Sequence, residues 1–169
     1  LERGLDHLHL VVGQEGTCRS TENGDHLERQ CLQHDLDVAT VEDLKNIRMV
    51  SSMPDYDGDG DAEEGMFYEI EGLQATLLTE IQTYATATAG AEIKYDAATY
   101  PYFMGADGKA YPNWTPRLLK AAYNYQVSIK DPGAFAHGPK YIIELLHDSI
   151  ADLGGDVATL ARTDAGHFA

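Results

Sequence analysis

The chain reads Asp131-Pro-Gly-Ala-Phe-Ala-His-Gly-Pro-Lys-Tyr-Ile-Ile-Glu-Leu-Leu146 near its carboxyl end, and this stretch decides the fold. Pro139 suits the first position of a helix, where its fixed φ is already helical and its missing N–H costs nothing. Apolar residues then recur at the spacing of one helical face. They are Ile142, Leu145, Leu146, Ile150 and Leu153. Gly154 and Gly155 offer a left-handed stop. The stretch predicts a core-facing helix with His137 just before its start.

Two more helices are predicted upstream. The nearer one begins with Thr115 as N-cap and Pro116 at the first position. It ends at Asp131-Pro132, because the residue before a proline disfavours helical backbone. The longest helical pattern runs from Ala62 to about Ala89 and ends at Gly90. The apolar positions of these helices are Leu118, Ala122, Tyr125 and Ile129, and Met66, Ile70, Leu73, Leu77, Ile81 and Tyr84.

The remaining segments add a short helix and little sheet. Thr40, with Asp43 three residues later, predicts an N-cap that opens a helix to about Val50. Residues 92–95 form a candidate strand, and Asp107-Gly108 is a hairpin signal between aromatic flanks.

The elements together predict a mainly α fold of about four helices, with long loops and at most a small β-hairpin. Residues 40–169 form this helical domain, and residues 1–39 precede it as an amino-terminal arm and loop region.

Composition and charge limit the classes of function. The 169 residues suffice for one domain with a core, and 43% of them are hydrophobic, as is usual for a globular chain. The net charge of −16 argues against nucleic acid as a partner, because binding phosphates requires a basic surface. No apolar run approaches the roughly 18 residues that indicate a membrane span. Both ends read as cut, which predicts a mature fragment or one segment of a longer chain.

An acidic stretch, Asp55-Tyr-Asp-Gly-Asp-Gly-Asp61, lies ahead of the long helix. Carboxylates at alternate positions and a glycine at the sixth match the first half of the calcium loop D-x-[DN]-x-[DN]-G. The twelfth position is Met66 instead of the usual bidentate glutamate, and Glu63 or Glu64 would take its place. An acidic turn that caps the helix is the alternative, but the aspartates would repel one another without a cation. We therefore expect a structural calcium site over residues 55–64. Its predicted ligands are Asp55, Asp57, Asp59, Asp61 and Glu64.

Several segments occur in an order that resembles a known family. They are Pro54-Asp-Tyr-Asp-Gly-Asp-Gly60, Glu64-Gly65, Tyr100-Pro-Tyr-Phe103, Trp114-Thr-Pro-Arg-Leu-Leu-Lys-Ala-Ala-Tyr-Asn-Tyr-Gln126 and Asp131-Pro-Gly-Ala-Phe-Ala-His137. Together they resemble the haem-poor helical region of large bacterial multihaem c-type cytochromes, and the likeness covers roughly Val41 to the carboxyl terminus. The resemblance implies an exported chain, periplasmic or extracellular, with an electron-transfer role as a segment of, or a domain derived from, such a cytochrome. Its partners would be other cytochrome segments or subunits and redox proteins.

His137 acquires a specific role through this resemblance. In those cytochromes a histidine at a helix start, in a His-Asn-Pro setting, commonly serves as the distal axial ligand of a haem attached elsewhere. The corresponding residues here are His137-Gly138-Pro139, with glycine in place of asparagine. Axial ligation requires a neutral imidazole in a fixed orientation, which a packed helix start provides. A loop histidine bonded to backbone is the alternative.

The chain contains no Cys-x-x-Cys-His motif, so it cannot attach a c-type haem by itself. Haem c would be attached outside this chain, or this copy has lost its motifs and serves as scaffold. Cys18 and Cys31 form either a disulfide in an oxidising compartment or two free thiols. Each other histidine is expected at the surface or in a structural setting, with haem ligation as the alternative. These are His7, His9, His26, His34, His147 and His167.

No residue pair has a spacing that favours acid–base catalysis over solvation or metal binding, so we expect no enzymatic activity. The predicted cofactors are Ca²⁺ and haem c. A second hypothesis, from a different class, is a haem-free, calcium-stabilised helical module that binds another protein. Its contact surface would be the aromatic loop Tyr100–Trp114. Haem absorption that is sensitive to loss of His137 distinguishes the two.

Overall fold

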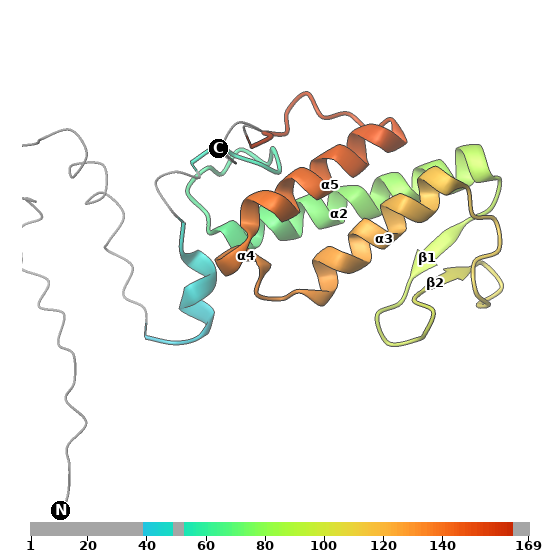
Figure 1. Ribbon diagram of the computed structural model, residues 1–169, viewed down its shortest axis with the longest axis horizontal. Coiled ribbons are helices and arrows are strands. Elements are labelled where there is room, and N and C mark those ends of the chain that lie inside the picture. Colours follow the sequence, from blue (N-terminus) through green and yellow to red (C-terminus); the bar gives the residue numbers. More distant parts are fainter. Residues whose placement is uncertain (1–38, 49–52, 164–169) are drawn as a thin grey trace, which may run out of the picture. The chain divides into compact units, whose positions relative to one another are not determined.

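The computed structural model describes residues 39–48 and 53–163. Its elements are η1 (Glu42–Asn46), α2 (Met66–Tyr84), η3 (Ala85–Ala89), β1 (Ile93–Tyr95), β2 (Phe103–Gly105), α3 (Pro116–Lys130), α4 (Ala134–His137) and α5 (Pro139–Leu153). The predicted mainly α fold with one small antiparallel hairpin is confirmed (Figure 1). Among the described residues, no helix is both long and apolar enough to cross a membrane.

Some predictions lie outside the described residues. They concern the arm up to residue 38, Cys18 and Cys31, and His7, His9, His26, His34 and His167.

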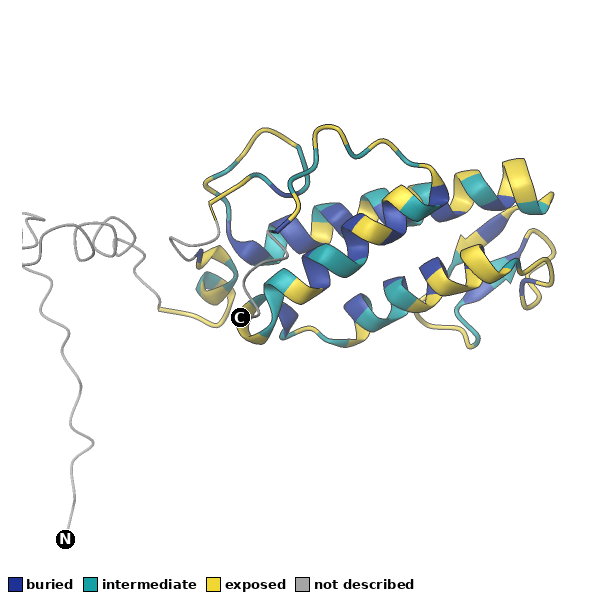
Figure 2. Ribbon diagram, turned by 45° about the horizontal axis from the view of Figure 1, so that its top comes forward, coloured by how far each residue is buried: buried dark blue, intermediate teal, exposed yellow. Residues whose placement is uncertain are grey.

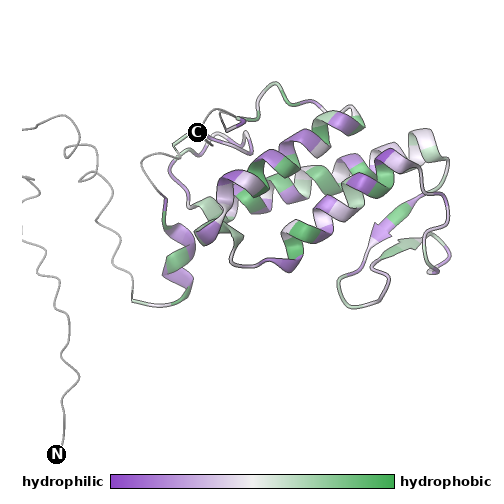
Figure 3. Ribbon diagram, viewed as in Figure 1, coloured by the Kyte–Doolittle hydropathy of each residue, from purple (hydrophilic) through white to green (hydrophobic). Residues whose placement is uncertain are grey.

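The core lies between α2, α3 and α5, which pack against one another. Buried residues line the facing sides of these helices (Figure 2), and the same sides are the hydrophobic ones (Figure 3). The fully buried apolar side chains of the three helices include Leu73, Leu77, Ile81, Leu118, Ile143, Leu146 and Ile150. Of the predicted apolar positions, Tyr84, Ile129 and Leu145 are only partly buried. The predicted helical spacing thus identifies the sides of the helices that face the core. Ile143 is fully buried there as well, although it is not among the predicted positions.

The long helix α2 begins at Met66, where its apolar pattern begins, and not at Ala62 as predicted. Gly65 is the N-cap and is extended, with φ −72° and ψ 154°. It lies against the end of η1, so closely that a Cβ on Gly65 would be 2.7 Å from the Cα of Asn46. This close approach fixes the start of α2. At the other end the chain continues as the π-helical turn η3, and Gly90 ends it with φ 75°, as predicted.

Thr40 and Asp43 form reciprocal hydrogen bonds, but the N-cap is Val41 and not Thr40 as predicted, and the helix that follows is shorter than expected. Thr40 N donates to Asp43 Oδ2 at 2.7 Å, and Asp43 N donates to Thr40 Oγ1 at 3.3 Å. The helix is a 3-10 helix that ends at Asn46, not near Val50. Ile47 is extended, and its carbonyl accepts from Met66 N at 3.3 Å. This contact with the start of α2 replaces further helical bonding.

Local signals place α3 and α5 correctly. Thr115 caps α3, because its hydroxyl accepts from Leu118 N at 3.1 Å. Helix α5 begins at Pro139 and ends at Gly154, whose φ is 91°. In the hairpin, Ile93 pairs with Gly105, and residues 96–102 connect the two strands. The turn at Asp107-Gly108, where the sequence carries its hairpin signal, follows β2 instead and closes an isolated bridge between Met104 and Ala110.

Candidate metal site

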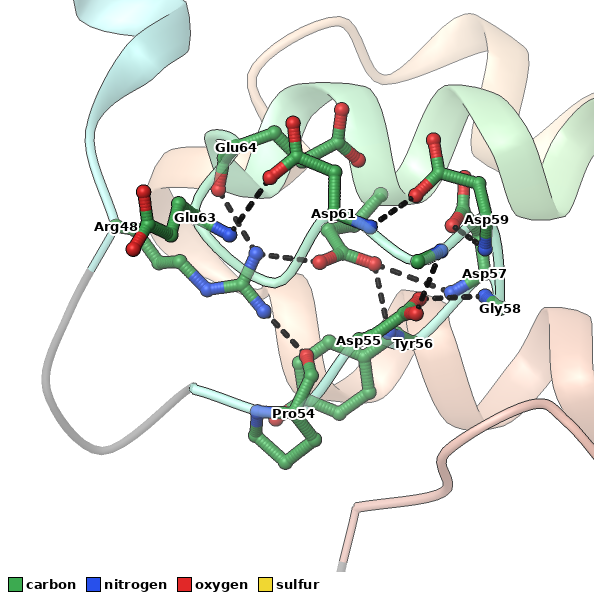
Figure 4. Close-up of polar contacts among 12 residues, drawn as sticks. Arg48, Pro54, Asp55, Tyr56, Asp57, Gly58, Asp59, Asp61, Glu63 and Glu64 are labelled. Carbon is green, nitrogen blue, oxygen red and sulfur yellow. Dashed lines mark hydrogen bonds and ion pairs between the residues drawn. The ribbon is translucent and has the colours of Figure 1, made fainter.

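The acidic loop, residues 55–64, precedes α2, and Asp55 organises its first turn (Figure 4). One oxygen of Asp55 accepts from Gly58 N at 2.6 Å, and the other accepts from Gly60 N at 2.9 Å. The two glycines have φ values of 78° and 98°, which glycine adopts without the strain that a Cβ would cause. Asp55 therefore holds a tight, glycine-dependent turn.

The next three carboxylates also support the backbone. Asp57 Oδ1 accepts from Asp59 N at 3.1 Å, and Asp59 Oδ1 accepts from Asp61 N at 2.7 Å. Asp61 Oδ1 accepts from Glu63 N at 3.0 Å. These are Asx turns, in which a short acidic side chain bonds the amide two residues later. The aspartates at alternate positions thus stabilise the backbone turns of the loop, whether or not they also bind a cation.

Glu69, on the first turn of α2, ties the loop to the helix. Its side chain is 0% exposed, and Oε1 forms an ion pair with Arg48 Nη1. The other oxygen accepts from Tyr56 N at 2.7 Å and from Asp57 N at 3.1 Å. A buried carboxylate is stable only when it is paired and hydrogen-bonded, and Glu69 meets both conditions.

Arg48 connects the two ends of the acidic loop. Its guanidinium donates to the carbonyl of Glu64 at 2.8 Å and to the carbonyl of Pro54. The guanidinium also lies over the ring of Tyr56, 5.9 Å from its centroid. Because Pro54 directly precedes the loop and Glu64 is its last residue, one side chain holds both ends in place (Figure 4).

The structure brings the predicted ligands Asp57, Asp59 and Glu64 together, with one oxygen of each within 4.8 Å of the others. Asp55 lies in a second group of the same kind, with Asp57 and Glu69. Asp61 belongs to neither of these two groups of described residues.

Glu69 is the site residue that sequence reasoning misses. Its sequence position could have revealed it. Glu69 lies between Met66 and Ile70 on the apolar face of α2, where an apolar side chain is normally found, so a carboxylate there indicates a buried partner.

Burial and mutual repulsion perturb two of the loop carboxylates. Burial, followed by the nearby carboxylates of Asp57 and Glu69, raises the pKa of Glu64 to about 7. Burial likewise raises the pKa of Asp57 to about 6, with smaller contributions from the charges of Asp59, Glu69 and Asp55. Both shifts mean that the ionised loop is disfavoured unless a positive charge enters it.

The free energy of unfolding of the cation-free protein is expected to fall as pH rises from about 5 to about 7. The raised pKa values of Asp57 and Glu64 let the folded state hold more protons than the unfolded chain in that range, so lower pH favours folding. The carboxyls whose pKa is lowered, Asp43, Asp96 and Asp148, lose their contribution only in more acidic solution. Urea unfolding of chelator-treated protein across this pH range measures the slope. A flat profile contradicts the prediction.

Two glycines let the loop approach other parts of the fold closely. A Cβ on Gly72 of α2 would overlap Asp57 Oδ2 and lie 2.6 Å from Asp57 Cγ. A Cβ on Gly58 would lie 2.9 Å from the carbonyl oxygen of Thr159, in the segment after α5. The Asp57 carboxylate thus rests on the bare backbone of α2, and the first turn of the loop contacts the carboxyl-terminal segment.

His137 belongs to neither of these groups of described residues. It is the last residue of the short helix α4, and its side chain is 64% exposed. Its Nε2 lies 3.0 Å from Asp131 Oδ1, so its polar partner is a carboxylate and not the backbone group considered as the alternative. The other described histidine, His147, is buried on α5 beside Asp148, as expected for a structural residue.

Comparisons of the chain with family models, with curated proteins and with solved structures found no match.

Proposed function

We propose that the described domain is a helical scaffold stabilised by Ca²⁺ in the acidic loop, with Asp57, Asp59 and Glu64 as its carboxylate ligands. The observation that carries the proposal is Glu64 Oε1, which is buried and has no hydrogen-bond partner among the described residues. A buried polar atom without a partner costs about 1–3 kcal/mol, and more when charged. A cation between the three carboxylates offsets that cost.

The chemistry of the donors supports calcium over other metals. All the candidate ligand atoms in the two acidic groups are carboxylate oxygens, which hard cations prefer. Zinc sites instead use mainly thiolate and imidazole ligands. Magnesium demands a near-ideal octahedron and keeps several waters, whereas Ca²⁺ accepts irregular sets of six to eight oxygens. Backbone carbonyls and water would complete the set around three side chains.

Calorimetric titration of chelator-treated protein with CaCl₂ tests the proposal, together with thermal unfolding in the presence and absence of Ca²⁺. At a free concentration of about 100 times Kd, bound Ca²⁺ adds about 2.7 kcal/mol to the free energy of unfolding. Binding should remove the fall in stability towards neutral pH, because Ca²⁺ keeps the carboxylates ionised. No heat of binding and no shift in melting temperature would refute the site.

Asp57→Asn and Asp61→Asn form a matched pair for locating the ligands. Both variants remove one negative charge from the loop, and both residues bond the amide two positions later. We expect Asp57→Asn to weaken calcium binding by tenfold or more and Asp61→Asn to weaken it about threefold or less. Equal losses would favour the wider ligand set that the sequence predicts.

For the role of this scaffold, we propose the one that the resemblance implies, a segment of an exported multihaem cytochrome in which His137 serves as an axial ligand. The supporting observation is the setting of the imidazole: it is accessible, and Asp131 orients one of its nitrogens at 3.0 Å. Carboxylate partners of this kind hold metal-binding histidines in place. The haem would be attached outside this chain, and when bound it would supply one-electron redox chemistry.

Haem titration tests this role. The calcium-loaded chain is mixed with haem, and the Soret band is recorded for the wild type, His137→Ala and Asp131→Asn. A histidine-ligated spectrum that is lost in His137→Ala supports the role. A wild-type spectrum that does not differ from that of the alanine variant rejects it.

The aromatic loop Tyr100–Trp114 favours the alternative of a protein-binding module. Tyr100 is 82% exposed, whereas Phe103 and Tyr111 are buried and hold the ring of Trp114 edge-on, at 5.9 and 5.1 Å between centroids. Exposed aromatic side chains on an anchored loop are typical of protein contacts. A colourless protein that binds no added haem leaves this alternative in place.

A further inference from the structure

A pocket of about 200 Å³ lies where α2 and α3 meet the segment that leads into α4. Its buried lining residues are Ile70, Ser128 and Ala134. Two partly buried phenylalanines, Phe67 and Phe135, add apolar surface and contact each other edge-to-face at 5.6 Å. None of the acidic-loop carboxylates lines this pocket, so it is distinct from the candidate metal site.

The polar groups of the pocket are mainly hydrogen-bond acceptors. Glu71, which is exposed, and Asp131 are the acidic residues of the lining, and Asp131 Oδ1 also lies 3.0 Å from His137 Nε2. The hydroxyl of Ser128 already donates to the carbonyl of Tyr125 at 2.8 Å, so towards the pocket its oxygen can only accept. Gln74 is the one lining side chain that offers amide donors. A ligand that complements this lining therefore donates hydrogen bonds, and the two acidic residues favour one with a positive charge.

We propose that this pocket binds a small organic ammonium ion with an apolar body. The apolar body would lie against Ile70, Ala134 and the two phenylalanine rings, and the ammonium group would face Glu71 and Asp131. Charge complementarity favours this class, because two carboxylates line the pocket and the whole chain carries a net charge of −16.

The volume sets the size of the apolar body. An apolar protein cavity of roughly 150 Å³ holds a benzene molecule, so a pocket of about 200 Å³ accommodates a single aromatic ring with a short amine. Ligands of this size bind weakly, and we expect a Kd of about 1 mM.

Titration of the calcium-saturated chain with benzylammonium chloride, followed by ¹H–¹⁵N NMR spectra, tests the proposal. Benzyl alcohol serves as the neutral ligand of similar shape. We expect benzylammonium to bind at least threefold more tightly than the alcohol, because each exposed ion pair contributes only modestly. The largest shifts should fall on the amides of Ile70, Ala134 and Phe135.

Glu71→Gln and Glu92→Gln provide the matched variants, since both remove one exposed carboxylate and only Glu71 lines the pocket. Glu71→Gln should weaken benzylammonium binding about threefold and leave benzyl alcohol unaffected, whereas Glu92→Gln should change neither. Phe135→Ala should weaken both ligands. Equal affinity for the two ligands, equal effects of the two glutamine variants, or shifts confined to residues 55–64 would overturn the proposal.

Discussion

Replacing Glu69 with glutamine is expected to lower the free energy of unfolding by about 3–5 kcal/mol. The side chain of Glu69 is 0% exposed and accepts from the Arg48 guanidinium at one oxygen and from two backbone amides at the other. Glutamine keeps the shape but has one acceptor and one donor. Its NH₂ group must therefore face either Arg48 or the amides of Tyr56 and Asp57, and the Arg48 guanidinium loses the negative charge of Glu69.

Urea unfolding of the calcium-free protein measures this effect. Glu71→Gln is the control, because Glu71 is exposed on the same helix, and its replacement should change the free energy by about 0.5 kcal/mol or less. A similar loss in both variants would show that the Arg48–Glu69 pair does not hold the loop. Calcium affinity should fall as well in Glu69→Gln, since the amide of Asp57 is one of the groups that Glu69 fixes.

Gly72→Ala is expected to weaken calcium binding by about 10–100-fold and to lower the free energy of unfolding of the metal-free protein by about 1–3 kcal/mol. The added Cβ would overlap Asp57 Oδ2 and lie 2.9 Å from Asp57 Cβ, so the carboxylate must swing away and the loop backbone at Asp57 must shift with it. That shift strains the hydrogen bonds of Asp57 N to Glu69 and of Asp59 N to Asp57 Oδ1. This cost exceeds the roughly 0.5–1 kcal/mol by which alanine is favoured over glycine in a helix interior.

Calorimetry with CaCl₂ and urea unfolding in chelator give the two readouts for Gly72→Ala. Thr79→Ala, at an exposed position on the same helix, is the control and should leave calcium affinity unchanged. Wild-type affinity in Gly72→Ala would mean that Asp57 does not bind the cation. Metal-free stability equal to or above that of the wild type would mean that the loop takes up the added methyl group without a shift at Asp57.

Local signals in the sequence predict most of the fold. Pro139, Thr115 and Gly90 act within their own segments, through fixed φ, side-chain capping and left-handed backbone, so the predicted boundaries hold. The start of α2 and the end of η1 are different, because they depend on a contact between Met66 and Ile47. A contact between segments that are distant in the sequence leaves no periodic pattern to read.

The same distinction applies to the candidate site. The aspartates at alternate positions are visible in the sequence, because loop spacing and cation chemistry are both local. The neutralising partner of Glu69 is Arg48, which lies before the loop and gives no local signal. The sequence also cannot separate Asp57 from Asp61, since both occur in the same repeat. Only packing against Gly72 brings Asp57 into both groups of convergent carboxylates.

Gly58 lies close to Thr159, so the first turn of the acidic loop packs against the segment after α5, and we expect the two to open together. Arg162 holds the segment that carries Thr159 against α5. Its guanidinium donates to both carboxylate oxygens of Asp148, at 2.8 and 3.0 Å. Fraying of this last segment uncovers the first turn of the acidic loop, and fraying of the loop removes the support of the segment. Hydrogen exchange at Gly58 and at the amides after α5 should therefore slow together when Ca²⁺ binds. A cation bound ahead of α2 would then also protect the segment that follows α5.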